Sequence, residues 1–204
     1  MIRLWLVAAA LPALAAAQHS AAPRPAPAAF VSEQYGLTFK TATHSLYCRL
    51  PKDWVGSDHG TVVFLAAPER CYGAGFPSSG RGFDGNVARI EIFYAYAVDD
   101  DDEGAPEPCI SIGRVRFLAR DRPLCKAAGK GHVEISVSAR YMADIRSQAV
   151  FTLVTTSGRL QRDLAVFRSV VSSARTCTAT WRDGKGGVFT TGSGSPCPKE
   201  ARFF

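Results

Sequence analysis

The sequence predicts an α+β domain, in which an antiparallel sheet is covered by one main C-terminal amphipathic helix and the loops are stapled by disulfides. Three observations lead to this prediction. Residues 132–141 alternate apolar and polar side chains over ten positions, as a strand with one solvated face does. Residues 159–175 place apolar side chains at spacings of 4, 3, 4 and 3, which is typical of an amphipathic helix. The chain also holds six cysteines, an even number that is typical of a disulfide-linked exported domain.

Two segments are expected to precede the domain. Residues 1–17 join one positive charge, Arg3, to a short apolar run that ends in three alanines, which is typical of a secretory signal peptide. The run is shorter than the roughly 20 residues that a membrane span requires. Residues 18–32 are rich in proline and alanine, so we expect an extended linker there. The prediction is therefore a periplasmic or secreted protein with no transmembrane segment after signal cleavage and a single domain over residues 33–204.

Short runs of aromatic and β-branched residues, bounded by glycine and proline, predict the strands of the sheet. In chain order these runs are residues 35–40, 45–50, 60–67, 86–98, 114–118, 132–141 and 147–156. A glycine-rich stretch, residues 70–85, is expected to be a long loop. Residues 178–181 and 188–191 flank a turn-rich stretch and are expected to form a terminal hairpin.

The predicted helix follows the last strand of the sheet. Its expected buried stripe consists of Leu160, Leu164, Phe167, Val171 and Ala174. Ser157 is expected to cap its N-terminus, because a serine side chain can accept a hydrogen bond from the first free backbone N–H groups. Arg175 is expected to complement the negative end of the helix dipole.

The six cysteines allow many pairings, and the sequence alone does not choose among them. Cys177 and Cys197 bracket the terminal hairpin, whose turn should bring them together. Each bridge between neighbours in the chain would stabilise the fold by about 3 kcal/mol in the chain-entropy model. No C-x-x-C pair is present, so zinc binding is disfavoured. The favoured hypothesis pairs Cys48 with Cys71, Cys109 with Cys125, and Cys177 with Cys197.

No arrangement of residues typical of catalysis stands out. The chain lacks the G-x-S-x-G nucleophile motif. His44 and His59 lie near predicted turns, and His132 lies on the solvated face of a predicted strand. Glu91 and Glu134 are isolated strand carboxylates, without the paired arrangement that a glycosidase needs. The protein is therefore predicted not to be an enzyme and to need no cofactor, and a secreted hydrolase with an unrecognised site is the alternative.

An acidic run is a weak candidate for a metal site. Asp99, Asp101 and Glu103 followed by Gly104 imitate positions one, three, five and six of a calcium-binding loop. The bidentate glutamate expected at position twelve is missing, and Ile110 stands there instead. We therefore favour a solvated acidic loop over a calcium site.

Charge suggests the kind of partner. The net charge of +6 favours anionic neighbours such as an acidic protein, a cell-wall polymer or a lipid headgroup. Nucleic acid is not expected, because the basic residues are scattered and the chain is predicted to be exported. The expected partner is a protein or an anionic envelope component. Tyr94, Tyr96 and Tyr141 could line a ligand surface on the sheet, but core or half-buried packing is favoured for them.

Both ends of the predicted domain carry a family resemblance. Residues 35–39 (YGLTF), followed by residues 50–54 (LPKDW), resemble the opening of the PsbP-like superfamily of small α/β sandwiches. The strand at 150–155, followed by a helix that closes on residues 167–173, resembles its ending. The three disulfides and the hairpin after the helix depart from the usual form. The resemblance implies a non-catalytic envelope protein with no shared catalytic residues, and hence an exported binding protein of the bacterial envelope.

Overall fold

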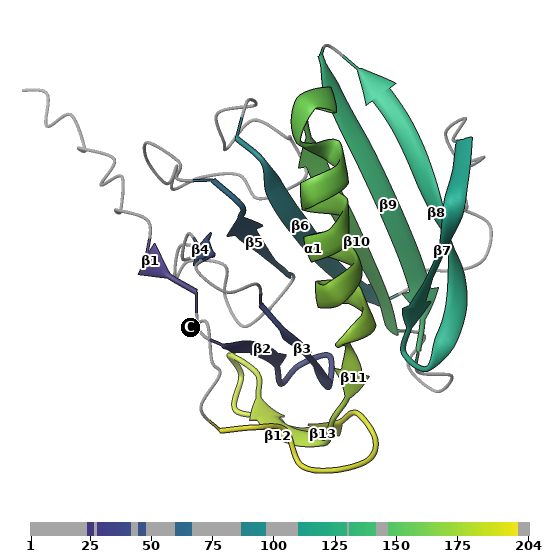
Figure 1. The fold of residues 1–204 in the computed structure, drawn as a ribbon. Coiled ribbons are helices and arrows are strands. Elements are labelled where there is room, and N and C mark those ends of the chain that lie inside the picture. The colour runs from purple at the N-terminus through teal and green to yellow at the C-terminus, as the bar shows by residue number, and fades with distance from the viewer. Residues whose placement is uncertain are drawn as a thin grey trace, which may run out of the picture.

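A computed structural model describes most of the predicted domain. Strands account for 59% of the described residues and form three sheets, whereas the single α-helix, α1 (Leu160–Ser172), has 13 residues (Figure 1). The predicted α+β class, an antiparallel sheet covered by one main C-terminal helix, is therefore wrong, because strands dominate this part of the chain. The described residues are 24–26, 28–41, 45–47, 60–66, 87–96, 110–129, 131–141 and 147–199.

The largest sheet is antiparallel and has eight strands. Most of the strands predicted for it are present, but β8 was not predicted, because its arginines and proline do not resemble a strand. In spatial order the sheet contains β1 (Arg24–Pro25), β4 (Leu46–Tyr47), β5 (Gly60–Phe64), β6 (Arg89–Tyr96), β10 (Ser147–Thr155), β9 (His132–Arg140), β8 (Arg120–Gly129) and β7 (Ile110–Phe117).

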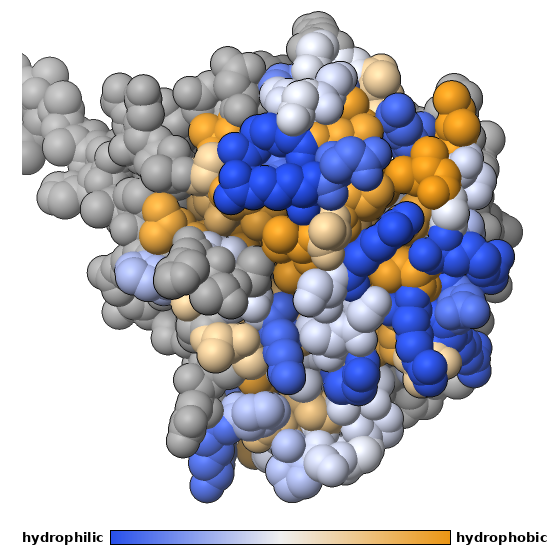
Figure 2. All heavy atoms as spheres, viewed as in Figure 1, coloured by the Kyte–Doolittle hydropathy of each residue, from blue (hydrophilic) through white to orange (hydrophobic). Residues whose placement is uncertain are grey.

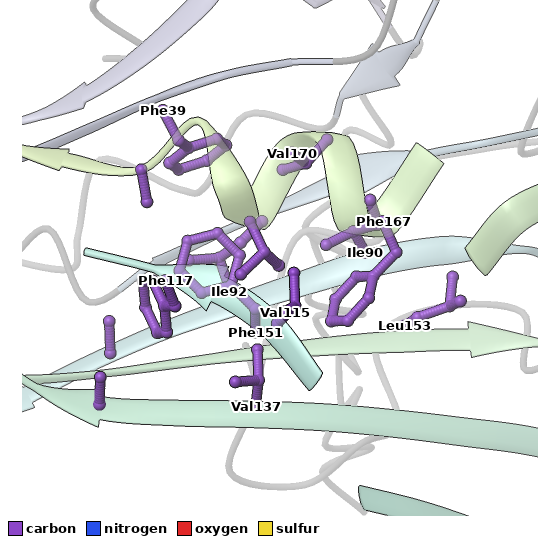
Figure 3. Packing of buried hydrophobic residues seen from close by; sticks show 14 of the residues in the cluster. Phe39, Ile90, Ile92, Val115, Phe117, Val137, Phe151, Leu153, Phe167 and Val170 are labelled. Atoms are coloured by element: carbon purple, nitrogen blue, oxygen red, sulfur yellow. The ribbon is translucent and has the colours of Figure 1, made fainter. Parts of the chain in front are cut away.

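The large sheet curls around α1. The helix contacts both β10 and β7, although β9 and β8 separate these two strands within the sheet. Figure 3 shows side chains of β7, β10 and α1 gathered in one cluster, and the rings of Phe117 and Phe151 meet edge to face with centroids 5.1 Å apart. Phe167 of α1 is fully buried in the same cluster. The helix therefore fills the hollow of a curved sheet.

A second sheet joins the N-terminal part of the described chain to the end of the helix. It contains β11 (Arg175–Thr176), β3 (Leu37–Lys40) and β2 (Ala29–Ser32), in that order. The predicted linker, residues 18–32, overlaps β1 and β2. Phe30 is fully buried and its ring stacks on Phe39 at 5.0 Å. Residues 29–32 thus belong to the packed core, even though proline and alanine surround them in the sequence.

The third sheet is a hairpin of two strands, β12 (Ala179–Arg182) and β13 (Val188–Thr191), at the positions predicted for it. It follows β11 directly, and Figure 1 shows it at the end of the domain beside β2 and β11.

A buried carboxylate fixes the start of α1. Asp163 is 1% exposed, and its Oδ2 accepts hydrogen bonds from the Thr155 hydroxyl at 2.6 Å and from Arg159 Nε at 3.0 Å. Arg159 Nη2 donates to Asp163 Oδ1 at 3.2 Å and to the Leu65 carbonyl at 3.1 Å. This network links the helix to the end of β10 and to the residue after β5. Both carboxylate oxygens of Asp163 therefore have donors, as burial of a charged group requires.

The two ends of the helix compare differently with their predictions. Ser157 does not cap α1, because a 3-10 turn, η2 (Ser157–Arg159), precedes the helix and its N-cap residue, Arg159, makes no side-chain cap. At the other end Arg175 Nη1 donates to the carbonyls of Ser172 at 2.8 Å and Ala174 at 2.6 Å. The prediction that Arg175 complements the C-terminal end is confirmed.

We expect Asp163→Ala to lower the free energy of unfolding by about 3 kcal/mol, because it leaves Arg159 and Thr155 without their buried acceptor. Urea unfolding of the oxidised protein measures this. Asp121→Ala is the matched control, because Asp121 is exposed and its side chain makes no hydrogen bond or ion pair with the described residues. A loss under about 0.5 kcal/mol for Asp163→Ala, similar to an ordinary surface substitution, would contradict the importance of the network.

The turn between β7 and β8 is conformationally strained. Leu118 and Ala119 both have positive φ, 51° and 64°, as the central residues of a two-residue type I′ hairpin do. Asparagine and glycine normally occupy such positions, because a Cβ atom costs about 1–2 kcal/mol in this conformation. The pairing of Phe117 with Arg120 across the turn is regular nonetheless. The packing of the hairpin therefore maintains this backbone conformation.

We expect Ala119→Gly to stabilise the protein by about 0.5–1 kcal/mol, because glycine adopts positive φ without steric cost. Ala128→Gly, in the exposed end of β8, should instead destabilise by a similar amount, because glycine weakens an extended strand. Thermal unfolding of the two variants compares them directly. A lower melting temperature for Ala119→Gly than for the unmodified protein would contradict the strain argument.

Candidate functional site

The candidate site is the terminal hairpin, defined as residues 179–191. Its strands pair in regular antiparallel register from Ala179 with Thr191 to Arg182 with Val188. The turn is fixed by Asp183, whose Oδ1 accepts from the backbone N–H of Lys185 at 2.9 Å and of Gly187 at 2.7 Å. The backbone N–H of Asp183 also donates to the Gly187 carbonyl at 3.0 Å. The hairpin thus has an internally bonded turn.

A disulfide ties the base of the hairpin together. Cys177 and Cys197 are bonded, with Cα atoms 4.8 Å apart and a sequence separation of 20. The backbone N–H of Thr178 donates to the Ser195 carbonyl at 2.8 Å, and that of Cys197 donates to the Thr178 carbonyl at 2.9 Å. The predicted Cys177–Cys197 pair is confirmed, and it indicates an oxidising compartment.

The other predicted bridges are less completely described. Cys125 is disulfide-bonded, and its partner is not among the described residues. The remaining three cysteines lie outside the described residues, so the predicted pairs Cys48–Cys71 and Cys109–Cys125 stay predictions. No cysteine in the described part of the chain is free.

Two glycines press the hairpin against the turn between β2 and β3. A Cβ atom on Gly36 would overlap the Cα atom of Gly192. A Cβ atom on Gly192 would overlap the carbonyl oxygen of Cys177. The backbone N–H of Cys177 donates to the Gly36 carbonyl at 2.8 Å, and the Thr191 hydroxyl donates to the Glu33 carbonyl. This close backbone contact, together with the disulfide, holds the hairpin on the domain.

One face of the terminal hairpin changes from buried to exposed along its length. Ala179 and Thr191 are buried against the domain, at 8% and 7% exposure. Farther along the same face the rings of Trp181 and Phe189 stack, with centroids 5.0 Å apart and planes inclined by 24°. Phe189 is 45% exposed, although it is an aromatic residue in a regular strand. The opposite face carries Val188, which is also largely exposed.

These exposed apolar groups are unusual for this protein. In the part of the chain that the structure describes, four large hydrophobic residues are exposed, and two of them are the neighbours Val188 and Phe189. These two side chains point to opposite faces, and on its own face Phe189 forms a continuous aromatic surface with Trp181, on which its ring stacks. Contiguous exposed apolar surface is a mark of interaction sites, whereas single exposed residues are ordinary. The terminal hairpin is therefore the best-supported candidate for a binding surface.

The charge around the hairpin is positive. Arg182 and Lys185 are exposed, and the one carboxylate of the hairpin, Asp183, is occupied by backbone N–H groups of the turn. Stacked aromatic rings with cations beside them suit a partner that offers an apolar patch with acidic groups near it.

Several residues singled out from the sequence lie elsewhere. His44, His59, Asp99, Asp101 and Glu103 fall outside the described residues, so neither the histidine hypothesis nor the calcium hypothesis is addressed. His132 is half-buried at the start of β9. The described residues contain no group of three or more histidine, cysteine or acidic side chains placed to hold a metal.

The tyrosines belong to the fold. Tyr94 is fully buried and stacks on Tyr35 at 5.3 Å. The Tyr141 hydroxyl donates to the Tyr35 carbonyl at 2.9 Å. The expectation of core or half-buried packing is confirmed for both, because Tyr94 lies in the core and Tyr141 is half-buried against it, whereas the side chain of Tyr96 is not described. Glu91 is paired with Arg89 at 2.6 Å, and Glu134 is exposed on the outer side of β9.

The stacked pair on the terminal hairpin was not identified from the sequence, although a signal was present. Trp181 and Phe189 are each four residues from Lys185, and a hairpin whose turn is centred on Lys185 places them opposite one another. Considering the register of the two strands together would have predicted the contact.

Comparison with known proteins adds no family to this description. No family model matches the chain, and a search of curated proteins finds no match. No helix among the described residues is both long and apolar enough to cross a membrane.

We expect Gly192→Ala to destabilise the hairpin attachment by about 2 kcal/mol more than Gly186→Ala does. Both glycines have positive φ, 84° and 86°, so both substitutions carry similar backbone strain. Only at Gly192 would the added Cβ also collide with backbone, whereas nothing lies within 4 Å of that position at Gly186. Hydrogen exchange of the hairpin amides together with urea unfolding measures the difference. Equal losses for the two variants would contradict the importance of the glycine contact.

Proposed function

We propose that the protein is an exported, non-enzymatic binding protein of the bacterial envelope, and that the terminal hairpin is the surface that binds. The observation that carries the proposal is the exposure of Val188 and Phe189 on a hairpin held by a disulfide and a close glycine contact. An exposed apolar surface costs solubility, so a fixed one is best explained by a partner that covers it.

Rigidity is a further argument for this proposal. Ordering a mobile loop on binding costs about 0.5–1.5 kcal/mol for each immobilised side chain. The terminal hairpin avoids much of that cost, because its turn and base are already bonded in one conformation. Aromatic residues at such positions often dominate the binding energy of an interface. The Trp181–Phe189 stack would supply this central contact.

The proposed location has separate support. The Cys177–Cys197 disulfide is of the kind that persists in an oxidising compartment such as the periplasm or the extracellular space. The signal-peptide pattern of residues 1–17 and the resemblance to the PsbP-like superfamily point in the same direction. The exposed cations beside the stack favour a partner with acidic groups, either a protein or an anionic envelope component.

The test is affinity capture from envelope extract with the immobilised, oxidised protein. The double variant Val188→Ser/Phe189→Ser should recover at least about ten-fold less of the specific partner, because it removes the exposed apolar contacts. The matched control is Phe93→Ser, which removes an aromatic side chain that is 38% exposed on β6, outside the terminal hairpin. The control should recover the partner as the unmodified protein does.

Two results would overturn the proposal. One is equal recovery of the partner by the double variant and the control. The other is turnover of a generic ester or glycoside panel by the purified protein, which would instead favour a secreted hydrolase.

A further inference from the structure

The arginines of this protein fall into two groups. Some are used by the fold: Arg89 pairs with Glu91 at 2.6 Å, and Arg159 pairs with the buried Asp163. Such arginines have carboxylate partners and are partly or wholly withdrawn from solvent. A second group, on the β7–β8 hairpin, has no carboxylate partner among the described residues. Three of its arginines, Arg114, Arg116 and Arg120, are exposed, whereas Arg122 is half-buried.

The β7–β8 hairpin, defined as residues 110–129, concentrates positive charge. None of its basic side chains forms an ion pair with a carboxylate of the described chain, and the one polar contact given for them is from Arg114 Nη2 to the Asp121 carbonyl at 3.2 Å. Asp121 is the single acidic residue of the hairpin. Figure 2 shows hydrophilic side chains gathered on the side of the molecule where Figure 1 places β7 and β8. The basic side chains are Arg114, Arg116, Arg120, Arg122 and Lys126.

The strand register distributes these cations over both faces of the hairpin. Arg116 stands opposite Asp121 on one face, whereas Arg120 stands opposite Phe117 on the other. Within a strand, side chains on one face repeat every second residue, at about 6–7 Å. Arg114 and Arg116 therefore form one short exposed row. The opposite face is the one that carries Val115 and Phe117, and there Arg120 is exposed beside the turn whereas Arg122 is half-buried.

The frame that carries the rows is well packed. Val115, Phe117 and Leu124 are buried, at 6%, 0% and 0% exposure, and they anchor both strands in the core beneath α1. Arg168 of α1 extends the positive surface toward β7, because its Nη2 lies 3.5 Å from the position that a Cβ on Gly113 would take. Among the described residues of the hairpin, five basic side chains face one acidic side chain, Asp121, so a net positive charge remains that a ligand with several negative groups would neutralise.

The geometry distinguishes among anionic ligands. A flat membrane surface reaches one face of a hairpin at a time, whereas these cations lie on two. Single-stranded nucleic acid is usually held by exposed aromatic rings on which the bases stack, and the one aromatic residue of the hairpin, Phe117, is fully buried. A linear chain of charged sugars needs rows of cations and no stacking platform. We propose that the β7–β8 hairpin binds an acidic polysaccharide.

This site goes beyond the proposed function, because it uses different strands and a different kind of contact from the terminal hairpin. Failure of one proposal therefore leaves the other in place. The capture experiment tests Val188 and Phe189, whereas the experiment below tests Arg116 and Arg120.

Heparin is a suitable probe, because it is a linear polysaccharide with regularly spaced negative groups. The oxidised protein is titrated with heparin in a calorimeter at several salt concentrations on either side of about 0.15 M. These titrations measure the affinity for heparin and its dependence on salt. Arg116→Gln/Arg120→Gln should bind roughly three- to ten-fold more weakly, because it removes one exposed cation from each face. Its affinity should also fall less steeply with salt, because fewer counterions are displaced.

The matched control is Lys40→Gln/Lys199→Gln, which removes two exposed cations outside both hairpins and lowers the net charge equally. It should bind heparin as the unmodified protein does. Circular dichroism and melting temperature establish that both variants are folded. A heparin disaccharide should bind more weakly than a long chain, because it cannot span a row of cations.

Each contrary outcome overturns the proposal. No heparin binding by the unmodified protein would exclude the site. If both double variants bind heparin equally weakly, net charge alone explains the binding and the β7–β8 hairpin is not a specific site. Tighter binding to single-stranded DNA, or to phosphatidylglycerol vesicles, than to heparin would replace the polysaccharide with a nucleic acid or a membrane.

Discussion

The buried carboxylate of Asp163 is the constraint on which the arrangement of the domain depends. It sets the point at which α1 begins, relative to the end of β10 and the residue after β5. Once α1 is placed, Phe167 and Val171 lie within the curl of the large sheet, and β7 can close over them. The same placement determines where the chain leaves the helix, and therefore where β11 and the terminal hairpin lie.

The curled sheet separates two surfaces of different character. The β7–β8 hairpin is built on the last two strands of the large sheet and shows cations on both faces. The terminal hairpin stands beyond the second sheet and shows apolar and aromatic side chains. Both are antiparallel hairpins held firmly at their base, one by packing under α1 and the other by a disulfide and two glycines. The domain thus presents two rigid hairpins with unlike chemistry.

Sequence reasoning succeeded where one periodic pattern dominates. The alternation in β9, the run in β10 and the stripe on α1 were each predicted, because burial of one face determines the position of apolar residues there. It failed where long-range contact decides. Asp163 looks like an ordinary surface residue of a helix, and only its contacts with Thr155 and Arg159 reveal its burial. β8 was not predicted, because its arginines and Pro123 are not typical of a strand. β2 was not predicted, because proline-rich sequence surrounds it. The predicted strand content was therefore too low, and the predicted fold class was wrong. The position of the terminal hairpin was predicted, but the stacked pair on it needed the register of both strands.

The disulfide at the base of the terminal hairpin also has a mechanical consequence. Cys177 and Cys197 connect the end of the domain to the chain that continues beyond the hairpin. A pulling force applied at the C-terminus would pass through the sulfur–sulfur bond and bypass residues 178–196. The strands that carry Trp181 and Phe189 would then bear none of the load. A protein tethered or dragged by its C-terminal end could keep this surface in shape under tension, a property that neither the hydrogen bonds of the hairpin nor its packing could provide alone.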